Sequence, residues 1–450
     1  MFQGIFDRKT ISLNGMWDYR IDQNDIGKRQ SWYLTDYSGN GWRTIQVPGN
    51  WYLNEEIGDY FGTIWYKKDF RLTEKKGERI FVRFEGVDYI TEVWLNGKYL
   101  GFHEGMFNPF EFEITDFVDY DGNNTLIVRD CAPKDPTEFI EADNDETPLS
   151  DGYKFHQSKG ITQIKGHMIE AMHRPGCYSK YRMDGNSGGI WGNVSIVTKP
   201  EIFIENVKIF TKIDMNGDGR EYQDSAMASF DVYINSNCAK EKEIELGLDI
   251  TPYNFEQEMN CTVKRTVIVR PGSNRFKLTA RIEQVALWWT WDHGKPNLYT
   301  ASITAMEDHI STNFGVKEIH QDEKGQWYLN NKHIFLRGMR YISSLWMSEA
   351  NEDMWNADFD KMLDMKINAI RIGSHIERDG VYKICDEKGL LLWQVFALHY
   401  CISDSDDVIS RAFGKMRMGY ASALAWFLVL LMGIVTGVIF AVSKKFVHYE

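Results

Sequence analysis

Side chains that could hold a metal ion occur in two places in this chain. Residues 214–219 read Asp-x-Asn-x-Asp-Gly, the ligand spacing with which a calcium loop begins. The twelfth position is Ser225, where such a loop needs a glutamate that binds through both carboxylate oxygens. His399 and Asp404 form a second pair, too small to be a complete ligand set. The sequence therefore predicts a glycine-rich turn near residue 216, with no metal and no cofactor.

Carboxylates could also act as a general acid, a general base or a nucleophile. Asp404, Asp406 and Asp407 follow the apolar segment 390–395, which reads as a buried strand. A strand end is a place where parallel barrels put catalytic groups. Three neighbouring acids form a solvated loop more often than a catalytic site. Which of the two applies here depends on the strands and helices that would hold these acids in place.

The first half of the chain consists of short alternating segments. Ile80, Val82 and Phe84 alternate with Phe81 and Arg83, as in a strand. Asn96-Gly97 separates two apolar runs, which is the pattern of a hairpin with a type I′ turn. Residues 10–130 therefore predict a β-sandwich or jelly roll. Residues 131–188 are polar and irregular, and residues 201–314 contain six or seven further strands that suit an immunoglobulin-like sandwich.

After residue 314 the spacing of the apolar residues changes, from strand segments alone to strands that alternate with segments of helical spacing. A short strand is predicted at residues 334–337, and a helix at 352–366 with Asn351 as its N-cap. A strand at 367–372, a helix at 379–388 that Gly389 ends, and a strand at 390–395 follow. Alternation of strands and helices indicates the opening of a parallel α/β domain.

Residues 419–442 contain no charged side chain. As a helix they would be about 36 Å long, against a hydrocarbon core of about 30 Å, so they predict one transmembrane helix. Gly433 and Gly437 could seat a second helix or face lipid. A buried helix of a soluble protein is the alternative interpretation, although such long helices usually carry a charged face.

The composition limits the function classes. The formal net charge is -13 and no long basic run occurs, so nucleic acid is not predicted as a partner. The six cysteines form no C-x-x-C pair, which favours a reduced, cytosolic chain over a disulfide framework. The first residues have no basic stretch followed by an apolar one, so no signal peptide is predicted.

Seven segments resemble glycoside hydrolase family 2, whose members include β-galactosidases, β-glucuronidases and β-mannosidases. They follow one another in the family's order from residue 13 to residue 394. In chain order they read LNGMWDY, VPGNW, VWLNGKYLGFHEGMFNPFEFEIT, GGIWGNVSI, LNNKHIFLRG, INAIRIGSHIE and CDEKGLLLWQ. As a set these motifs are specific to the family, although none is diagnostic alone.

The resemblance implies a mainly β chain with four parts. Residues 1–198 would be a jelly-roll sugar-binding domain, 199–314 an immunoglobulin-like β-sandwich, 315–413 the first three strands of a truncated (β/α)₈ barrel, and 414–450 a transmembrane helix with a short tail. Members of the family hydrolyse terminal β-glycosides with retention, using two carboxyl groups about 5 to 5.5 Å apart.

In the family these two carboxyl groups belong to later barrel strands than the three expected here. The resemblance therefore implies that the catalytic pair is absent, and no residue is assigned as catalytic. Asn54-Glu55 and Asn351-Glu352 repeat the dipeptide around the family's acid/base. The first lies in the jelly roll and the second opens a helix, so a solvated loop and a helix start are expected there.

Three positions are implied as substrate-binding by single matches to the family. His375, in the segment Ser-His-Ile-Glu after the second barrel strand, would donate to a sugar hydroxyl or serve as a structural histidine. Arg371 would orient carboxylates in the barrel interior or be a satisfied internal arginine. Asp184 would reach from the first domain into the sugar site.

Trp393 and Gln394 are also implied as substrate-binding, because they resemble the Trp-Gln-Asp-Phe segment of mannosidase-like members. There the indole stacks on a sugar ring. Val395 and Ala397 stand where the family has Asp and Pro, so this chain departs from the pattern beside the subsite.

The tail, residues 414–450, resembles the last helix of a sugar ABC transporter permease. A permease helix of this kind ends in the cytosol, whereas a lone tail anchor leaves the preceding domains in the cytosol. The hypothesis is a junction of two genes near residues 413 and 414, with cytoplasmic soluble domains and a single C-terminal membrane anchor.

Three functions follow from the two resemblances. The first is a β-galactosidase-like glycosidase of carbohydrate metabolism that hydrolyses little alone. The second is a membrane-anchored, non-catalytic carbohydrate-binding protein. The third is an enzyme completed by another polypeptide. The predicted partners are a terminal β-glycoside and the membrane, and the sequence names neither the sugar nor the oligomeric state.

Overall fold

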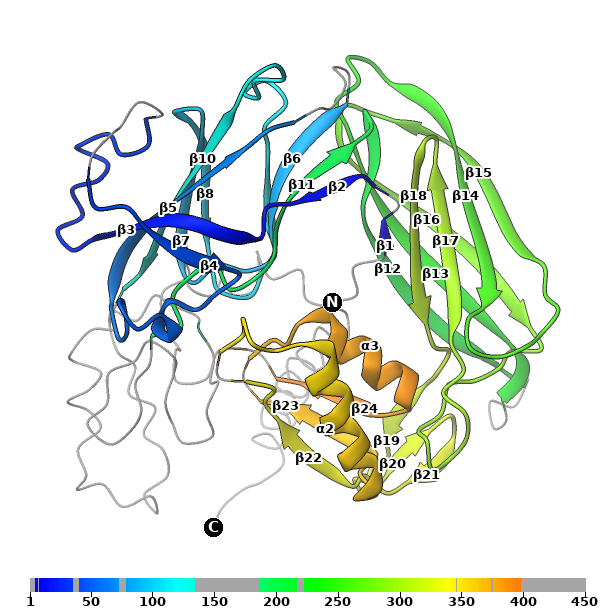
Figure 1. Cartoon of the computed structure of the whole chain (residues 1–450). Coiled ribbons are helices and arrows are strands. Elements are labelled where there is room, and N and C mark those ends of the chain that lie inside the picture. Colours follow the sequence, from blue (N-terminus) through cyan, green and yellow to red (C-terminus); the bar gives the residue numbers. More distant parts are fainter. Residues whose placement is uncertain are drawn as a thin grey trace, which may run out of the picture.

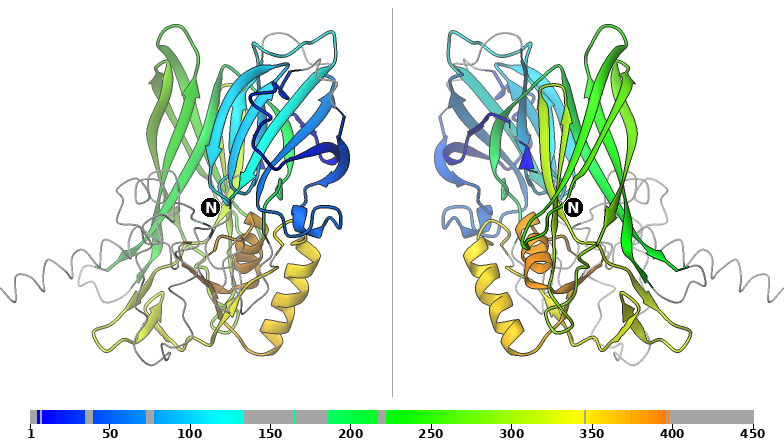
Figure 2. Two further views of the ribbon diagram at one scale, coloured as in Figure 1. Left: turned by 90° about the vertical axis from the view of Figure 1, so that its left-hand side faces the viewer. Right: turned by 90° about the vertical axis from the view of Figure 1, so that its right-hand side faces the viewer.

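Two β-sandwiches lie side by side, and a smaller α/β unit lies below both of them in the view of Figure 1. The computed structural model describes residues 5–6, 8–34, 40–72, 78–133, 165, 186–216, 222–344, 346–373, 375–395 and 397. The two turned views in Figure 2 show the same arrangement. The mainly β class is confirmed, and the two sandwiches occur in the predicted order.

The first sandwich consists of two antiparallel sheets. Their strand orders are β4-β3-β5-β10-β7-β8 and β2-β11-β6-β9. Alternate residues of the facing strands are apolar and fill the space between the sheets, among them Trp17, Tyr66 and Phe84. The strands are β2 (Thr10–Ser12), β3 (Gly15–Asp22), β4 (Arg43–Val47), β5 (Gly62–Phe70), β6 (Arg79–Phe84), β7 (Ile90–Leu95), β8 (Lys98–Glu104), β9 (Phe110–Glu113), β10 (Asn124–Ala132) and β11 (Val194–Lys199), with a 3₁₀ turn η1 (Trp51–Leu53) after β4.

The hairpin predicted at Asn96-Gly97 joins β7 to β8. Both residues have positive φ angles, 51° and 76°, as a type I′ turn requires. Asparagine tolerates this left-handed backbone and glycine has no Cβ to oppose it. The turn chemistry of these two residues therefore sets the pairing of the edge strand β8.

The second sandwich packs a five-stranded sheet, β1-β18-β17-β14-β15, on a three-stranded one, β12-β13-β16. Its first strand, β1 (Ile5–Phe6), comes from the start of the chain and pairs with β18, although the sequence assigned residues 1–198 to the first domain. Arg8 follows β1 and forms a bidentate ion pair with Asp308 at 2.9 and 2.6 Å. The other strands are β12 (Ile202–Met215), β13 (Tyr222–Ser236), β14 (Lys242–Pro252), β15 (Cys261–Val269), β16 (Gly272–Glu283), β17 (Tyr299–Ala305) and β18 (Asp308–Phe314).

The α/β unit contains a parallel sheet of β22 (Gly338–Tyr341), β23 (Ala369–Ile372) and β24 (Leu391–Gln394). Helices α2 (Glu352–Asp364) and α3 (Asp379–Lys388) connect these strands. The side chain of Asn351 accepts a hydrogen bond from the Met354 amide at 3.0 Å, and Gly389 ends α3 with a φ of 71°, so both predicted caps are confirmed.

The predicted strand at residues 334–337 is wrong. Ile334 ends β21 (Lys332–Ile334), which belongs to a small antiparallel sheet with β19 (Ile319–Gln321) and β20 (Trp327–Leu329), and the parallel sheet starts only at Gly338. Phe335 is largely exposed between the two strands. An apolar run was read as one buried strand, but tertiary contacts divide it between two sheets.

The α/β unit contacts the second sandwich through the tryptophan-rich segment that precedes β17. The Trp288 indole donates to the Asp386 carbonyl at 2.8 Å, and the Trp291 indole donates to the Ile367 carbonyl at 2.7 Å. These bonds orient the parallel sheet relative to the sandwich. Within the described residues no helix is long and apolar enough to span a membrane, and the predicted span 419–442 lies outside them.

Candidate functional site

The candidate site lies where β22, β23 and β24 end. The three strands run parallel, so their carboxyl ends lie at one edge of the sheet, where open and closed parallel sheets place ligands. This edge borders the first sandwich. Asn50 and Ser348 exchange two hydrogen bonds at 3.2 and 3.1 Å, and the rings of Tyr52 and Trp346 stack with centroids 4.6 Å apart.

A buried polar network joins the segments that follow β22 and β23. The Glu377 carboxylate accepts hydrogen bonds from the Ser343 hydroxyl at 2.6 Å and from the Ser343 amide at 3.0 Å. The side chains of Glu377 and His375 are fully buried and lie 2.8 Å apart, from Oε1 to Nε2. Burial raises the pKa of Glu377, but the bonds from His375 and Ser343 outweigh it, so the pKa is lowered from the usual value. The network therefore holds an ionised carboxylate between two strand ends.

Both nitrogens of the His375 ring face oxygen acceptors. Nε2 faces the Glu377 carboxylate, and Nδ1 lies 2.9 Å from the Gly373 carbonyl oxygen. A carboxylate and a carbonyl oxygen both accept hydrogen bonds, so the ring is held between two acceptors. The predicted contact between His375 and a sugar hydroxyl would require one of these bonds to break, and it stays a prediction.

Gln394 extends this network to the third strand. Its amide nitrogen donates to the His375 carbonyl at 2.6 Å and to the Val395 carbonyl at 2.8 Å. Its amide oxygen accepts a hydrogen bond from the Tyr382 hydroxyl of α3 at 2.6 Å. Gln394 therefore connects β24, α3 and the segment after β23, and its polar atoms are already engaged by the protein.

Trp393 points to the opposite face of the sheet from Gln394, because successive side chains of a strand alternate. Leu392 packs with the helices, whereas Trp393 is 59% exposed. Arg371 is the direct cross-strand partner of Trp393 and is also exposed. The structure thus brings Arg371 and Trp393 together on the open face and separates both from His375 and Gln394.

The remaining sequence candidates do not join this site. Glu55 is exposed after η1 and Glu352 is exposed at the start of α2, as a solvated loop and a helix start predict. The Asp214 carboxylate accepts a hydrogen bond from Ser225 at 2.7 Å and pairs with Arg281 at 3.1 Å. Asp184, His399, Asp404, Asp406 and Asp407 lie outside the described residues.

No role was predicted from the sequence for Glu377 or Ser343. The signal that could have identified Glu377 is the segment His-x-Glu directly after a parallel strand, which places a carboxylate two residues beyond a histidine. Ser343 gave no signal, because its partner is 34 residues away and only the parallel pairing of β22 and β23 makes them neighbours.

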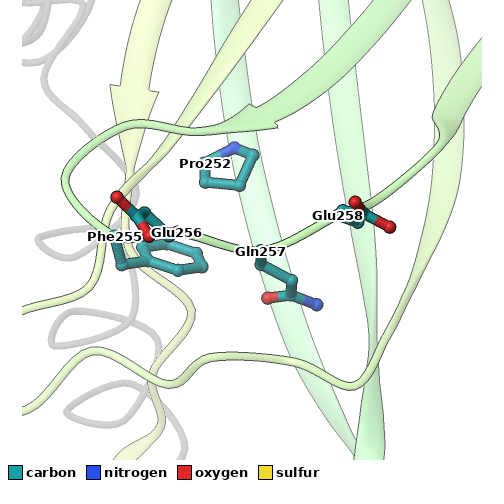
Figure 3. A pocket seen from close by; sticks show the side chains of 5 residues that line it. All are labelled: Pro252, Phe255, Glu256, Gln257 and Glu258. Carbon is teal, nitrogen blue, oxygen red and sulfur yellow. The ribbon is translucent and has the colours of Figure 1, made fainter.

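A shallow recess lies elsewhere, on the loop between β14 and β15. Figure 3 shows its lining side chains spread along the loop, with Glu256 and Glu258 pointing apart. Its other lining residues are Pro252, Phe255 and Gln257. Because these groups do not converge and two of them are carboxylates, the recess offers no ligand a closed set of contacts.

Two family models match the chain. Residues 10–157 match the sugar binding domain of glycosyl hydrolases family 2, and residues 203–317 match a second domain of glycosyl hydrolases family 2. The chain belongs to glycosyl hydrolase family 2. The matched segments cover most strands of the two sandwiches, all but β1 and β11, so the family resemblance read from the motifs is confirmed. The permease-like tail lies outside both segments and stays a prediction.

Family 2 relatives match most of this chain. A β-galactosidase of Thermoanaerobacter pseudethanolicus is 25% identical over 402 residues, which are 86% of this chain and 46% of the relative. A β-glucuronidase of Bacteroides fragilis is 25% identical over 407 residues, 86% of this chain and 49% of the relative. The chain therefore spans about half the length of these relatives.

Solved structures agree on the fold. The crystal structure of a Bacteroides uniformis β-glucuronidase superposes with a TM-score of 0.68 and 19% identity, covering 91% of this chain and 45% of that one. At this level of identity the similarity establishes the arrangement of the domains and nothing about the ligand.

Proposed function

We propose that this family 2 chain binds the terminal sugar of a β-glycoside on the open face of its parallel sheet, as a β-galactosidase-like protein of carbohydrate metabolism. The observation that carries the proposal is the exposed indole of Trp393 with Arg371 beside it in register. An indole offers a flat apolar surface on which the C–H groups of a sugar ring can pack, and a guanidinium donates to hydroxyl or carboxylate oxygens.

We infer that this face of the parallel sheet binds the sugar without cleaving it. Retaining hydrolysis needs two carboxyl groups about 5 to 5.5 Å apart that reach the anomeric carbon. Glu377 is the carboxylate that follows β23, and both of its oxygens are bonded to Ser343 and His375 in a buried network. Its position supports a structural role and not a nucleophile or a proton donor.

A β-glucuronide is a second candidate ligand, and Arg371 is the observation that favours it. A uronic acid carries a carboxylate, which a guanidinium binds through two parallel hydrogen bonds. A neutral galactose would accept hydrogen bonds from the same guanidinium through its hydroxyl oxygens, but it offers no opposing negative charge. Relatives named as β-galactosidase and as β-glucuronidase both match this chain, so they support the substrate class and do not separate the two sugars.

The test combines binding with turnover. We expect galactose or glucuronate to change the tryptophan fluorescence of the purified full chain, and we expect Trp393→Ala to weaken that binding about tenfold. The matched control is Tyr99→Ala, which removes an exposed aromatic ring from the first sandwich. Equal affinities in the two variants would refute the site. Hydrolysis of aryl β-galactosides or β-glucuronides above the uncatalysed rate would refute binding without cleavage.

We further propose that residues 419–442 anchor the chain in a membrane and leave both sandwiches in the cytosol. The support is the uncharged sequence alone. The full chain should stay with membranes after alkaline extraction, whereas a chain ending at residue 413 should be released. Long reads across the source DNA at residues 413 and 414 test the alternative that two genes were joined.

A further inference from the structure

A second tryptophan, Trp327, packs against the exposed indole of Trp393. The two rings have centroids 6.2 Å apart and planes inclined by 65°, which is an edge-to-face contact. Aromatic rings favour this arrangement because the positive edge of one ring meets the negative face of the other. Trp327 belongs to β20 and Trp393 to β24, which lie in different sheets, so only the tertiary structure brings the two indoles together.

The small antiparallel sheet turns an apolar face toward the parallel sheet. Strand alternation places Trp327 and Leu329 on one face of β20, and the register adds Ile334 of β21, the direct partner of Trp327. These three side chains pack in one cluster with Leu391 of β24. Leu391 lies two residues before Trp393 and therefore on the same face of the parallel sheet. The antiparallel sheet thus lies against the start of the open face, beside β24 (Figure 1).

Trp327 marks the point at which this apolar cluster ends. Leu329 and Ile334 are buried, Trp327 is half-buried, and Trp393 is 59% exposed. The cluster therefore holds the Trp327 ring from behind, and the ring meets Trp393 where the open face begins. A side chain packed in this way has few rotamers available to it.

The contact restricts the Trp393 indole before any ligand arrives. An exposed side chain without such a contact samples several rotamers, and ordering it on binding costs free energy. Trp327 removes part of that cost because it already holds the ring. More than half of the Trp393 surface stays exposed, so the contact leaves room for a sugar ring to pack on the indole.

The spacing between the indole and Arg371 depends on the same contact. Cross-strand pairing fixes the backbones of Arg371 and Trp393 relative to each other. The distance between the guanidinium and the ring still depends on the rotamer of Trp393. Holding the ring at one angle therefore holds both sugar contacts at one spacing, which is what a preorganised site requires.

We propose that Trp327 is the positioning residue of the sugar site and acts through Trp393, without a contact of its own to the ligand. It fixes the plane of the Trp393 indole relative to Arg371 and so gives the open face a preformed surface for one sugar ring. The inference rests on the proposed binding of a terminal sugar at Trp393. It adds a residue of the antiparallel sheet, for which no role was predicted from the sequence.

A double-mutant cycle on the purified full chain tests this role, with galactose and glucuronate as the ligands. Ligand-observed NMR titration measures the affinity without relying on a tryptophan signal. Trp327→Leu should weaken binding by a factor of about three to ten in the native background. In the Trp393→Ala background the same change should weaken binding by less than about twofold, because no indole is left to position.

Trp289→Leu is the matched control. Trp289 packs against the same apolar cluster as Trp327, and its ring lies under the Lys332 ammonium at 4.8 Å. Its replacement should lower the melting temperature as Trp327→Leu does, because both remove half-buried apolar surface. The affinity for the sugar should stay native in Trp289→Leu, which separates positioning from general destabilisation.

Fluorine NMR of the full chain labelled with fluorotryptophan reports on the contact without any sugar. The Trp393 resonance is identified by its loss in Trp393→Phe. It should shift in Trp327→Leu and also in Trp327→Phe, because the ring current of the neighbouring indole is removed or changed. Trp327→Phe keeps an aromatic partner, so its affinity should lie within about twofold of native, and it keeps the test decisive if Trp327→Leu does not fold.

The outcomes separate this inference from the function on which it rests. If Trp393→Ala and Tyr99→Ala bind equally well, the proposed sugar site is wrong and the positioning role falls with it. If Trp393→Ala weakens binding but Trp327→Leu does not, the sugar site stands and the positioning role is wrong. An equal loss from Trp327→Leu in both backgrounds, or an unchanged Trp393 resonance in the Trp327 variants, would also overturn the positioning role.

Discussion

Replacement of Glu377 by leucine tests the network at the strand ends. The carboxylate accepts three hydrogen bonds, from the Ser343 amide, the Ser343 hydroxyl and the His375 ring. Leucine accepts none, so three donors lose their partner, one of them on the completely buried ring of His375. Breaking a buried ion pair by removing one partner costs about 3 to 5 kcal/mol.

The free-energy cost of losing the hydrogen bonds from Ser343 is smaller than that of losing the bond from His375. Ser343 is only half-buried, so water can reach its hydroxyl and amide after the substitution. The lower end of the range, about 3 kcal/mol, is therefore the expected loss, and it corresponds to an opening equilibrium roughly a hundredfold larger. Glu377→Gln keeps one acceptor oxygen and should lie between leucine and the native chain.

Hydrogen exchange measures this effect at the bond itself, because the Ser343 amide donates to Glu377. Peptides containing Ser343 should exchange roughly a hundredfold faster in Glu377→Leu, while peptides from β13 in the second sandwich should be unchanged. The control is Glu349→Gln, which changes an exposed carboxylate six residues beyond Ser343. It should change the free energy of opening at Ser343 by less than about 0.5 kcal/mol. Native-like protection of Ser343 in Glu377→Leu would refute the assigned network.

Three further predictions concern the contacts that hold the sandwiches and the α/β unit together. Asp308→Asn breaks the buried bidentate pair with Arg8 and should destabilise the second sandwich by about 3 to 5 kcal/mol in urea unfolding, whereas Arg8→Met with Asp308→Leu should cost far less. Burial opposes ionisation of Asp292, but its hydrogen bonds lower its pKa to about 2. Its contribution to stability should therefore be complete above pH of about 3.9 and be lost as the pH falls toward about 2, and Asp292→Asn should remove that dependence from acid unfolding curves. Gly389→Ala places a Cβ 2.7 Å from the Trp291 nitrogen at a φ of 71°, so its melting temperature should fall and a native value would contradict the close packing.

Local features of the α/β unit were predictable because their causes lie within a few residues. The N-cap at Asn351 depends on one side-chain oxygen and the amide three residues later. The end of α3 depends on the left-handed backbone that Gly389 tolerates. The bounds of α3 accordingly agree with the prediction, and α2 begins where the cap requires.

Pairing over long distances was not predictable in the same way. Nothing near residue 334 indicates that its apolar run ends an antiparallel hairpin before the parallel sheet begins, because that break is decided by the partner strands. The first strand β1 pairs with β18 some 300 residues later, and no local pattern in two residues specifies such a partner.

The residue types alone determined the class of the chain: alternating segments make sandwiches, a change to helical period opens a parallel sheet, and the ordered motifs identify family 2. Only the tertiary structure decided which side chains share a surface. Strand alternation sends Trp393 to the open face and Gln394 into the helix layer, and parallel pairing brings Ser343 to Glu377. The physical reason is that hydrogen bonding and burial depend on which distant segments cover a residue, and that information is spread over the whole chain.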